Sequence, residues 1–317
     1  MQTPIVYGVD VAKAELVIAG PGASCVKLAN RVSEISRWLE GIPVGSFVAM
    51  ESTGSMHRLL AQLAHRHGMT VFVLNPRDIH HYARALGSRG KTDRNDAEVI
   101  ARYVAAEHGG LRPYVPASEL QERIDLLLRK RASVVCHRDA LRKSLSELPG
   151  LSDAAMRAMR SLAELLACID DQLEELVGSE PALVQRSELL RTMPGVGPLT
   201  SVSLANLLER VKLANADALV AFVGLDPKPN DSGQHRGRRR LSKRGPSEIR
   251  RLLYCAALTA ARGAWKPLYE ALRSRGLAST QAVCVIARKL LRVAWAMCRT
   301  NSPYDPALAP KPLDATT

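Results

Sequence analysis

The sequence has few aromatic residues and no long apolar run. Hydrophobic residues make up 46% of the 317 positions, and aromatic residues make up 4%. No uncharged apolar stretch reaches the roughly 18 residues of a membrane-spanning helix, and the opening MQTPIVYGVD lacks the basic flank and apolar core of a secretory signal. We therefore expect a folded cytoplasmic protein, and the composition excludes collagen-like, mucin-like and mostly disordered chains.

Cysteine is also scarce, with 6 residues that are widely spaced. No C-x-x-C pair occurs, which argues against a zinc site and against a dithiol redox motif. We expect the cysteines to be reduced core residues: Cys25, Cys136, Cys168, Cys255, Cys284 and Cys298.

Acidic residues are scarce in the C-terminal part of the chain, residues 191–317. Residues 191–317 carry 21 Lys or Arg and 8 Asp or Glu, whereas residues 1–115 have a net charge of +3 and residues 116–190 of −3. A concentrated positive field favours a polyanionic partner, because cations that neutralise phosphates release condensed counterions. The alternative, an anionic membrane surface, would require an amphipathic basic helix with aromatic anchors, and the sequence contains none.

Hydrophobic periodicity divides the chain into four parts. Residues 1–115 alternate between strand-like and helical segments in the order β-β-β-α-β-α-β-α-α, which predicts an RNase H-like α/β domain. Residues 116–190 show only helical spacing and predict two long antiparallel helices, possible partners in a coiled coil. Residues 191–303 predict a basic, mainly helical domain with a basic loop at 226–248, and we expect residues 304–317 to form a frayed tail.

Four carboxylates form the first candidate site. Asp10 and Glu51 each follow an apolar strand-like run, while Asp93 and Asp96 are three residues apart at the start of a predicted helix. If the first and fourth strands are neighbours, Asp10 and Glu51 converge, and the helix can bring the other two against them. Such a cage suits one or two Mg²⁺ ions. Alternatively, each carboxylate is an ordinary turn or helix-start residue.

The second candidate is the turn PGVGP at residues 194–198, between two helical segments. Gly195 and Gly197 allow a tight turn whose backbone N–H groups can contact a phosphate at a helix start, as in helix-hairpin-helix DNA-binding modules. The alternative is a plain helix-to-helix turn.

The third candidate is a basic strip with a single acidic residue, Glu248. We expect it to bind phosphates rather than to form a solvated charge run, and its members are Arg236, Arg238, Arg239, Arg240, Lys243, Arg244, Arg250 and Arg251. Three hydroxyls lie in or beside this strip: Ser232 in a turn before Gly233, Ser242 and Ser247. Composition alone does not separate these serines.

Five short strings in register resemble the DEDD transposases of bacterial insertion sequences, which are described as bridge-RNA-guided recombinases. The strings are GVDVAK (8–13), MESTG (50–54), KTDRNDA (91–97), MPGVGPLT (193–200), and FVGLDP (222–227) followed by DSG (231–233). They span nearly the whole chain. The chain departs from the family's commonest pattern at Ser52, where Ala is usual.

The resemblance implies a RuvC-like RNase H-fold domain, a coiled-coil segment and a C-terminal transposase domain. It also implies that Asp10, Glu51, Asp93 and Asp96 hold Mg²⁺ and that Ser232 is the nucleophile. The implied partners are donor and target DNA, a non-coding guide RNA, and further copies of the chain in a dimer or tetramer, with no membrane. Three other hypotheses remain: a RuvC-like nuclease that uses water, a non-catalytic nucleic-acid-binding protein and, more distantly, an actin-like sugar kinase.

Overall fold

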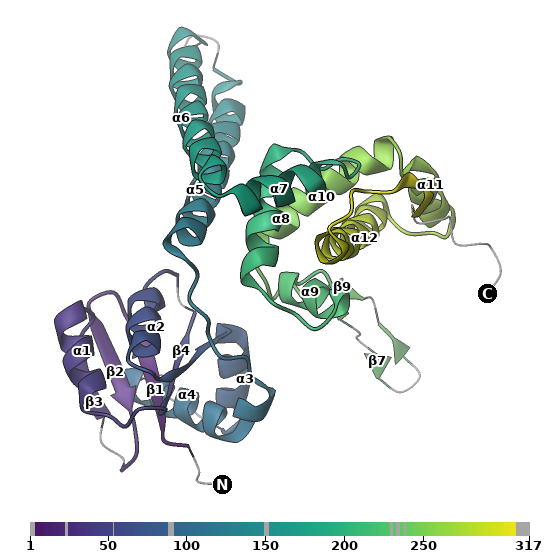
Figure 1. The fold of residues 1–317 in the computed structure, drawn as a ribbon. Helices are drawn as coiled ribbons and strands as arrows, with labels where there is room; N and C mark the ends of the chain where they lie inside the picture. The colour runs from purple at the N-terminus through teal and green to yellow at the C-terminus, as the bar shows by residue number, and fades with distance from the viewer. Residues whose placement is uncertain are drawn as a thin grey trace. The chain divides into compact units, whose positions relative to one another are not determined.

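The computed structural model describes residues 4–22, 25–52, 54–87, 92–148, 152–228, 231–232, 235–237 and 239–308. The chain forms two compact units, Met1–Pro116 and Ala117–Thr317 (Figure 1). Within the described residues, no helix is long and apolar enough to span a membrane.

A five-stranded mixed sheet forms the centre of the first unit, in the order β3-β2-β1-β4-β5. Its strands are β1 (Val6–Val11), β2 (Glu15–Ala19), β3 (Cys25–Ala29), β4 (Phe47–Glu51) and β5 (Thr70–Leu74). β1 pairs with β2 in antiparallel and with β4 in parallel orientation. The predicted adjacency of the first and fourth strands is therefore observed, and the mixed α/β fold is consistent with an RNase H-like domain.

Helices cover both faces of this sheet. α1 (Val32–Glu40) and α2 (His57–Arg66) pack on the face that carries Val9, Met50 and Val71. α3 (Pro76–Ala85) and α4 (Asp93–Glu107) pack on the opposite face, against Ala49 and Phe72. Because neighbouring residues of a strand point to opposite faces, the two apolar faces account for the nearly continuous apolar strands of the sequence. A short 3-10 turn, η1 (His108–Gly110), follows α4.

Gly8 lets α4 approach β1 closely. A Cβ atom at this position would lie 2.2 Å from the carbonyl oxygen of Ala97 and 2.4 Å from the backbone nitrogen of Ala101, both on α4. These atoms belong to helical backbone, so they cannot rotate away as a flexible side chain would. The residue type at position 8 thus sets how near the start of α4 lies to the end of β1.

Gly8→Ala should lower the local free energy of unfolding of the first unit by about 1–3 kcal/mol, since overpacking forces α4 away from the sheet. Amide hydrogen exchange in β1 and β4 of the full-length protein measures this loss. Gly109→Ala is the matched control, because a Cβ atom there has nothing within 4 Å, and its effect should stay within about 0.5 kcal/mol. Equal protection in both variants would contradict the close-packing argument.

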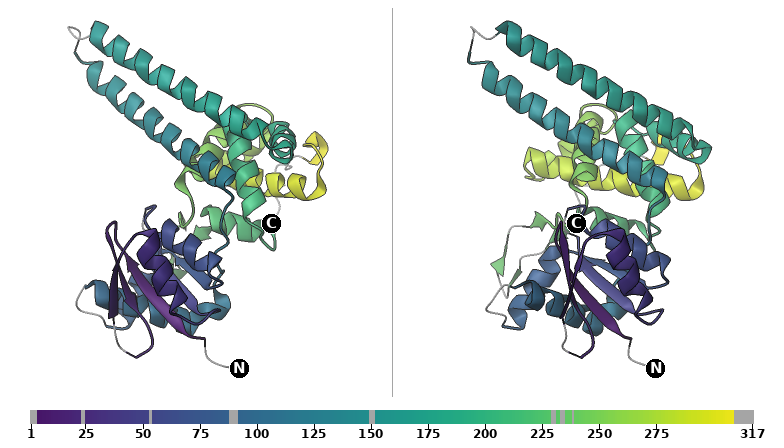
Figure 2. Two further views of the ribbon diagram at one scale, coloured as in Figure 1. Left: turned by 60° about the vertical axis from the view of Figure 1, so that its left-hand side comes forward. Right: turned by 90° about the vertical axis from the view of Figure 1, so that its left-hand side faces the viewer.

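The second unit begins with a long helical hairpin, α5 (Glu119–Leu145) and α6 (Ser152–Gly178), whose helices lie side by side (Figure 2). A capping box formed by Ser118 and Gln121 starts α5. The buried residues of the hairpin gather at its base, and they are Ile124, Leu128, Leu166, Ile169, Leu173 and Val177. The two predicted antiparallel helices are present, while a coiled coil stays a prediction.

A bundle of shorter helices packs against the base of the hairpin. It comprises α7 (Pro181–Arg191), α8 (Pro198–Arg210), α9 (Ala216–Val223), α10 (Ser247–Arg262), α11 (Lys266–Ser274), α12 (Ser279–Thr300) and the 3-10 turn η3 (Pro306–Leu308). A partly buried polar network joins α8 to α5: Asn206 donates to Asp125 Oδ1 (2.9 Å), and Arg210 pairs with Asp125 Oδ2 (2.6 Å). The hairpin and the bundle share one apolar core.

Three expectations need correction. The predicted basic loop at 226–248 contains four two-residue strands in two ladders, which are β6 (Pro227–Lys228) with β9 (Arg240–Leu241) and β7 (Asp231–Ser232) with β8 (His235–Arg236).

The cysteines are free, yet none is buried, because Cys136, Cys168 and Cys255 are exposed and the others half-buried. Tyr304, in the predicted frayed tail, accepts a hydrogen bond from Trp265 Nε1 (2.9 Å); residues 309–317 lie outside the described residues.

Candidate functional site

Asp10 and Glu51 lie side by side at the end of the parallel strand pair. The register of this pair aligns Val9 of β1 with Met50 of β4, so Asp10 and Glu51 are the next residues along each strand. Adjacent strands are about 4.8 Å apart. Since side chains alternate along a strand, Asp10 points to the same face as Gly8, which is the face that α4 covers. Both carboxylates are half-buried.

The helix α4 carries the other two carboxylates of the predicted tetrad. Thr92 caps the helix, its Oγ1 accepting a hydrogen bond from the Asn95 backbone nitrogen (3.2 Å), so Asp93 and Asp96 lie in the first turn. Asp96 directly precedes Ala97, which contacts Gly8.

Electrostatics relate Asp93 to the same region of the sheet. The ion pair with Glu15 (3.0 Å) raises the pKa of Lys27 on β3, and Asp93 raises that pKa further. Lys27 is aligned with Val17 of β2, and Val17 with Asp10 of β1. Asp93 therefore lies within electrostatic reach of Lys27, whose backbone belongs to the same row of the sheet as Asp10.

The chemistry of these carboxylates suits Mg²⁺, although the described residues contain no ready-made group of three or more His, Cys, Asp or Glu side chains that could hold a metal ion. Mg²⁺ in phosphoryl-transfer sites is commonly bound by one or two carboxylates, with water and substrate phosphates completing its octahedron. Asp10 and Glu51, on neighbouring strands, meet that smaller requirement. The donor set thus fits a divalent ion that binds together with a phosphate substrate.

The PGVGP turn joins α7 to α8 and is packed against α10. Gly195 has φ +79°, and a Cβ atom there would lie 2.2 Å from the carbonyl oxygen of Ala256. Gly197, the N-cap of α8, has open space around its Cα. Close packing is thus reason enough for a glycine at position 195, and a phosphate contact by this turn stays a prediction.

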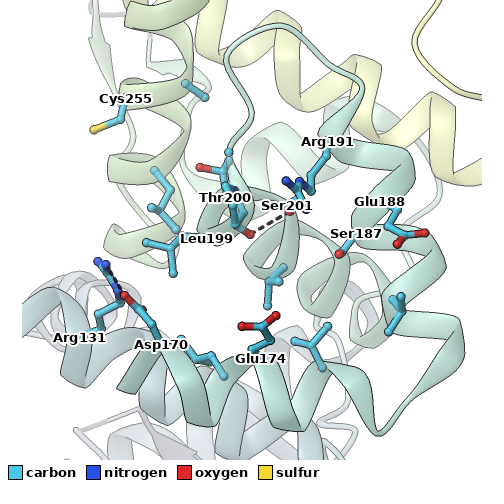
Figure 3. A pocket seen from close by; sticks show the side chains of 18 of the residues that line it. Arg131, Asp170, Glu174, Ser187, Glu188, Arg191, Leu199, Thr200, Ser201 and Cys255 are labelled. Carbon is cyan, nitrogen blue, oxygen red and sulfur yellow. Dashed lines mark hydrogen bonds and ion pairs between the residues drawn. The ribbon is translucent and has the colours of Figure 1, made fainter. Parts of the chain in front are cut away.

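A pocket of about 820 Å³ in the second unit has this turn as part of its wall (Figure 3). α5, α6, α7, α8 and α10 contribute its lining, which includes Gly195 and Gly197. Its polar groups are partly paired: Arg131 forms an ion pair with Asp170 (2.5 Å), and Ser201 donates to the carbonyl oxygen of Pro198 (2.8 Å). None of the predicted catalytic residues lines this pocket.

The predicted basic strip separates into two groups. Arg250 donates to the carbonyl oxygens of Val223 (2.9 Å) and Gly245 (2.5 Å), and Arg251 pairs with Glu248 (2.6 Å). These two arginines therefore have internal structural partners. The second group holds the remaining strip residues. Arg236 belongs to β8 and Arg240 to β9, while Arg239, Lys243 and Arg244 are exposed. Arg238 lies outside the described residues.

The structure gives the three candidate serines different surroundings. Ser242 donates a short hydrogen bond to Asp226 Oδ1, and Ser247 is the first residue of α10. Ser232 belongs to β7, where it is aligned with His235 of β8. Ser242 is thus occupied in joining the ends of the β6–β9 segment, a constraint that the sequence did not indicate.

The half-buried thiols of Cys284 and Cys298 are not competing nucleophiles. Burial raises the pKa of Cys298 to about 11 and also raises the pKa of Cys284. Both therefore carry a proton near neutral pH, and only a thiolate is strongly nucleophilic.

Comparisons with known proteins agree over the length of the chain. A family model for an IS110-type DEDD transposase matches residues 7–148, and one described as "Transposase IS116/IS110/IS902 family" matches residues 187–271. The pilin gene-inverting protein of Moraxella lacunata is 28% identical, covering 94% of this chain and 97% of its own. The transposase for insertion sequence element IS1111A of Coxiella burnetii is 26% identical, covering 94% of this chain and 91% of its own. An uncharacterized 42 kDa protein of insertion element IS900 from Mycobacterium paratuberculosis is 23% identical, covering 97% and 98%. The chain belongs to the DEDD transposase family of bacterial insertion sequences.

Proposed function

We propose that this transposase cuts and rejoins DNA through a serine–DNA intermediate, with a divalent metal held by Asp10, Glu51, Asp93 and Asp96. The observation that carries the proposal is the adjacency of Asp10 and Glu51 at the end of the β1–β4 pair. Both side chains are half-buried, and carboxylate oxygens on neighbouring strands are a donor set that suits Mg²⁺ in phosphoryl-transfer sites.

The carboxylates would bind Mg²⁺ and orient the scissile phosphate. Asp10 and Glu51 sit on strands inside a sheet, and Asp93 and Asp96 on a capped helix, so rigid elements carry all four. When bound, Mg²⁺ neutralises negative charge that develops on the phosphate and on the departing oxygen. The close contact at Gly8 then serves the site, because it fixes the distance between the helix and the strand.

Ser232 is the proposed nucleophile. Its Oγ forms a bond to phosphorus while the bond between phosphorus and the DNA 3′-oxygen breaks; the serine proton passes to solvent and the released 3′-oxygen takes up a proton. The phosphoserine link conserves the bond energy of the phosphodiester, so rejoining needs no ATP. Cations beside Ser232 in the sequence, such as Arg236, Arg238 and Arg240, would hold the neighbouring phosphates.

The partners proposed for this reaction are donor and target DNA, a non-coding guide RNA and further copies of the chain. The net charge of +13 in residues 191–317 suits backbone contacts, which carry no sequence information themselves. Base pairing with a guide RNA would supply sequence choice, as in other RNA-guided systems. The name of the Moraxella relative, a gene-inverting protein, is compatible with exchange of DNA strands without loss of DNA.

The second candidate function is a RuvC-like nuclease, in which the carboxylates act and water is the nucleophile. The two functions predict different products. We expect full-length protein incubated with element DNA and Mg²⁺ to yield a protein–DNA adduct that survives denaturation and disappears on protease treatment. Free DNA ends at full yield without any adduct would replace the recombinase by the nuclease. RNA that co-purifies with the protein tests the guide separately.

A further inference from the structure

The helix α12 carries a group of cations that lies outside the basic strip. Between Ala271 and Tyr304 the sequence has no Asp or Glu, and α12 itself contributes Arg288, Lys289 and Arg292 within about one turn. Arg288 and Arg292 are four residues apart, so they face each other along one side of the helix. Like charges at that spacing destabilise a helix.

Lys243 is positioned beside this group. The charge of Lys243 acts to lower the pKa of the Cys284 thiol, as does the charge of Arg288, which lies one turn further along α12. Its backbone nitrogen donates to the carbonyl oxygen of Gly224 (3.1 Å), the residue that ends α9. α9 is in contact with α12, so this hydrogen bond ties the backbone at Lys243 to the helix that packs on α12 (Figure 1).

The backbone at Lys243 is in the left-handed region, with φ +54°. Few non-glycine residues adopt this conformation, and the strain is of order 1 kcal/mol or more. The neighbouring Gly245 leaves no room to shift the loop, because a Cβ atom there would lie 1.9 Å from the carbonyl oxygen of Phe222. The chain therefore keeps a lysine where a glycine would be less strained.

The cations outnumber the carboxylates that act on them. Asp217 pairs with Arg292 (2.5 Å) and also acts on Arg288. Burial lowers the pKa of Arg288 and of Lys289, and neighbouring arginines lower both further. In the part of the chain that the structure describes, no carboxylate contributes to the pKa shift of Lys289. Half-burial and mutual repulsion both disfavour this arrangement unless an anion is bound.

We infer that Lys243, Arg288, Lys289 and Arg292, here called the α12 cation cluster, bind consecutive phosphates of a nucleic-acid backbone. The inference rests on the proposed function and adds a site to it. Phosphates fit because they are compact, singly charged and regularly spaced, so that cations one helical turn apart can each meet one. The cluster carries no base-reading arrangement and should bind without regard to sequence.

The test uses the double variant Arg288→Gln/Lys289→Gln, which leaves the Arg292–Asp217 ion pair intact. Its matched control is Arg157→Gln/Arg160→Gln, which removes two exposed cations from α6 of the same unit. Binding of full-length protein to a short DNA duplex and to a single-stranded RNA is measured by fluorescence anisotropy over a range of salt concentrations. We expect the log–log salt slope of the cluster variant to fall by about 1–2 units, and that of the control to change by much less.

The salt slopes for the DNA duplex and for the RNA are compared. The nucleic acid whose slope falls in the cluster variant is the one whose phosphates the cluster binds. Equal slopes for the cluster variant, the control and the parent protein would overturn the inference while leaving the proposed function standing. Failure of the parent protein to bind either nucleic acid would overturn the proposed function itself. The two failures are therefore distinguishable.

A single substitution separates binding from folding. Lys243→Gly removes the cation and relieves the left-handed strain, so the melting temperature should be retained or raised while nucleic-acid affinity falls. A lysine with only a structural role would give the opposite result, a lowered melting temperature and unchanged affinity.

Discussion

Glu51→Gln should reduce DNA strand exchange by at least about a hundredfold, because it removes one of the two adjacent carboxylates proposed to bind the metal ion. Asp10→Asn should do the same, since its side chain is the neighbour of Glu51 across the β1–β4 pair. Nucleic-acid binding should change little, because the concentrated positive charge lies in residues 191–317. The measurement is recombination of a donor and a target plasmid.

The same substitutions separate metal binding from folding. Each keeps the size of the side chain that it replaces, so the variants should fold, and their melting temperatures without metal are the reference for the effect of Mg²⁺. Added Mg²⁺ should raise the melting temperature of the parent protein, because a ligand that binds only the folded state stabilises it. The Glu51→Gln variant should lose most of that shift.

Glu107→Gln is the control, since Glu107 is an exposed carboxylate at the opposite end of α4. It should retain strand exchange and the response to Mg²⁺. Parent-level recombination by Glu51→Gln and Asp10→Asn would remove these carboxylates from the mechanism. A lowered melting temperature together with lost activity would instead assign them a structural role.

The first unit could be predicted well from sequence because its signals are local. Five apolar runs separated by turns predicted five strands, and the β-β-β-α-β order determined which strands are neighbours. The placement of Asp10 and Glu51 directly after their runs then implied their adjacency. The need for Gly8 was not predicted, because the atoms that a Cβ would meet belong to α4, about ninety residues away in sequence.

The second unit was predicted less completely because its partners are distant in sequence. Arg250 belongs to the basic strip by composition, yet it donates to Val223, whose carbonyl belongs to α9. The two-residue strands of the β6–β9 segment have no periodicity that a pattern could detect. The α12 cations were missed because their apolar neighbours gave the helix the pattern of a core element, although the absence of acidic residues between Ala271 and Tyr304 was a usable signal.

Ser232→Ala should abolish both the covalent protein–DNA adduct and strand exchange while leaving binding and folding intact. Its Oγ is the proposed attacking atom, and without it no phosphoserine bond can form. Removing a nucleophile typically lowers the rate by several orders of magnitude, and the loss cannot be recovered by longer incubation. Ser232→Cys keeps a nucleophilic atom at this position. A weak residual adduct in this variant would show that residue 232 itself supplies the attacking atom and does not only shape the surrounding segment.

The other two serines of the segment separate chemistry from structure. Ser247→Ala changes the first residue of α10 and should keep nearly full activity. Ser242→Ala removes a hydrogen bond to Asp226, so it should lower stability by about 1 kcal/mol and keep part of the activity. If Ser232→Ala still cleaves DNA at the parental rate with Mg²⁺ present, water is the nucleophile and the reaction is that of a nuclease. If instead only Ser242→Ala loses the adduct, the nucleophile is Ser242, whose hydroxyl is hydrogen-bonded to Asp226.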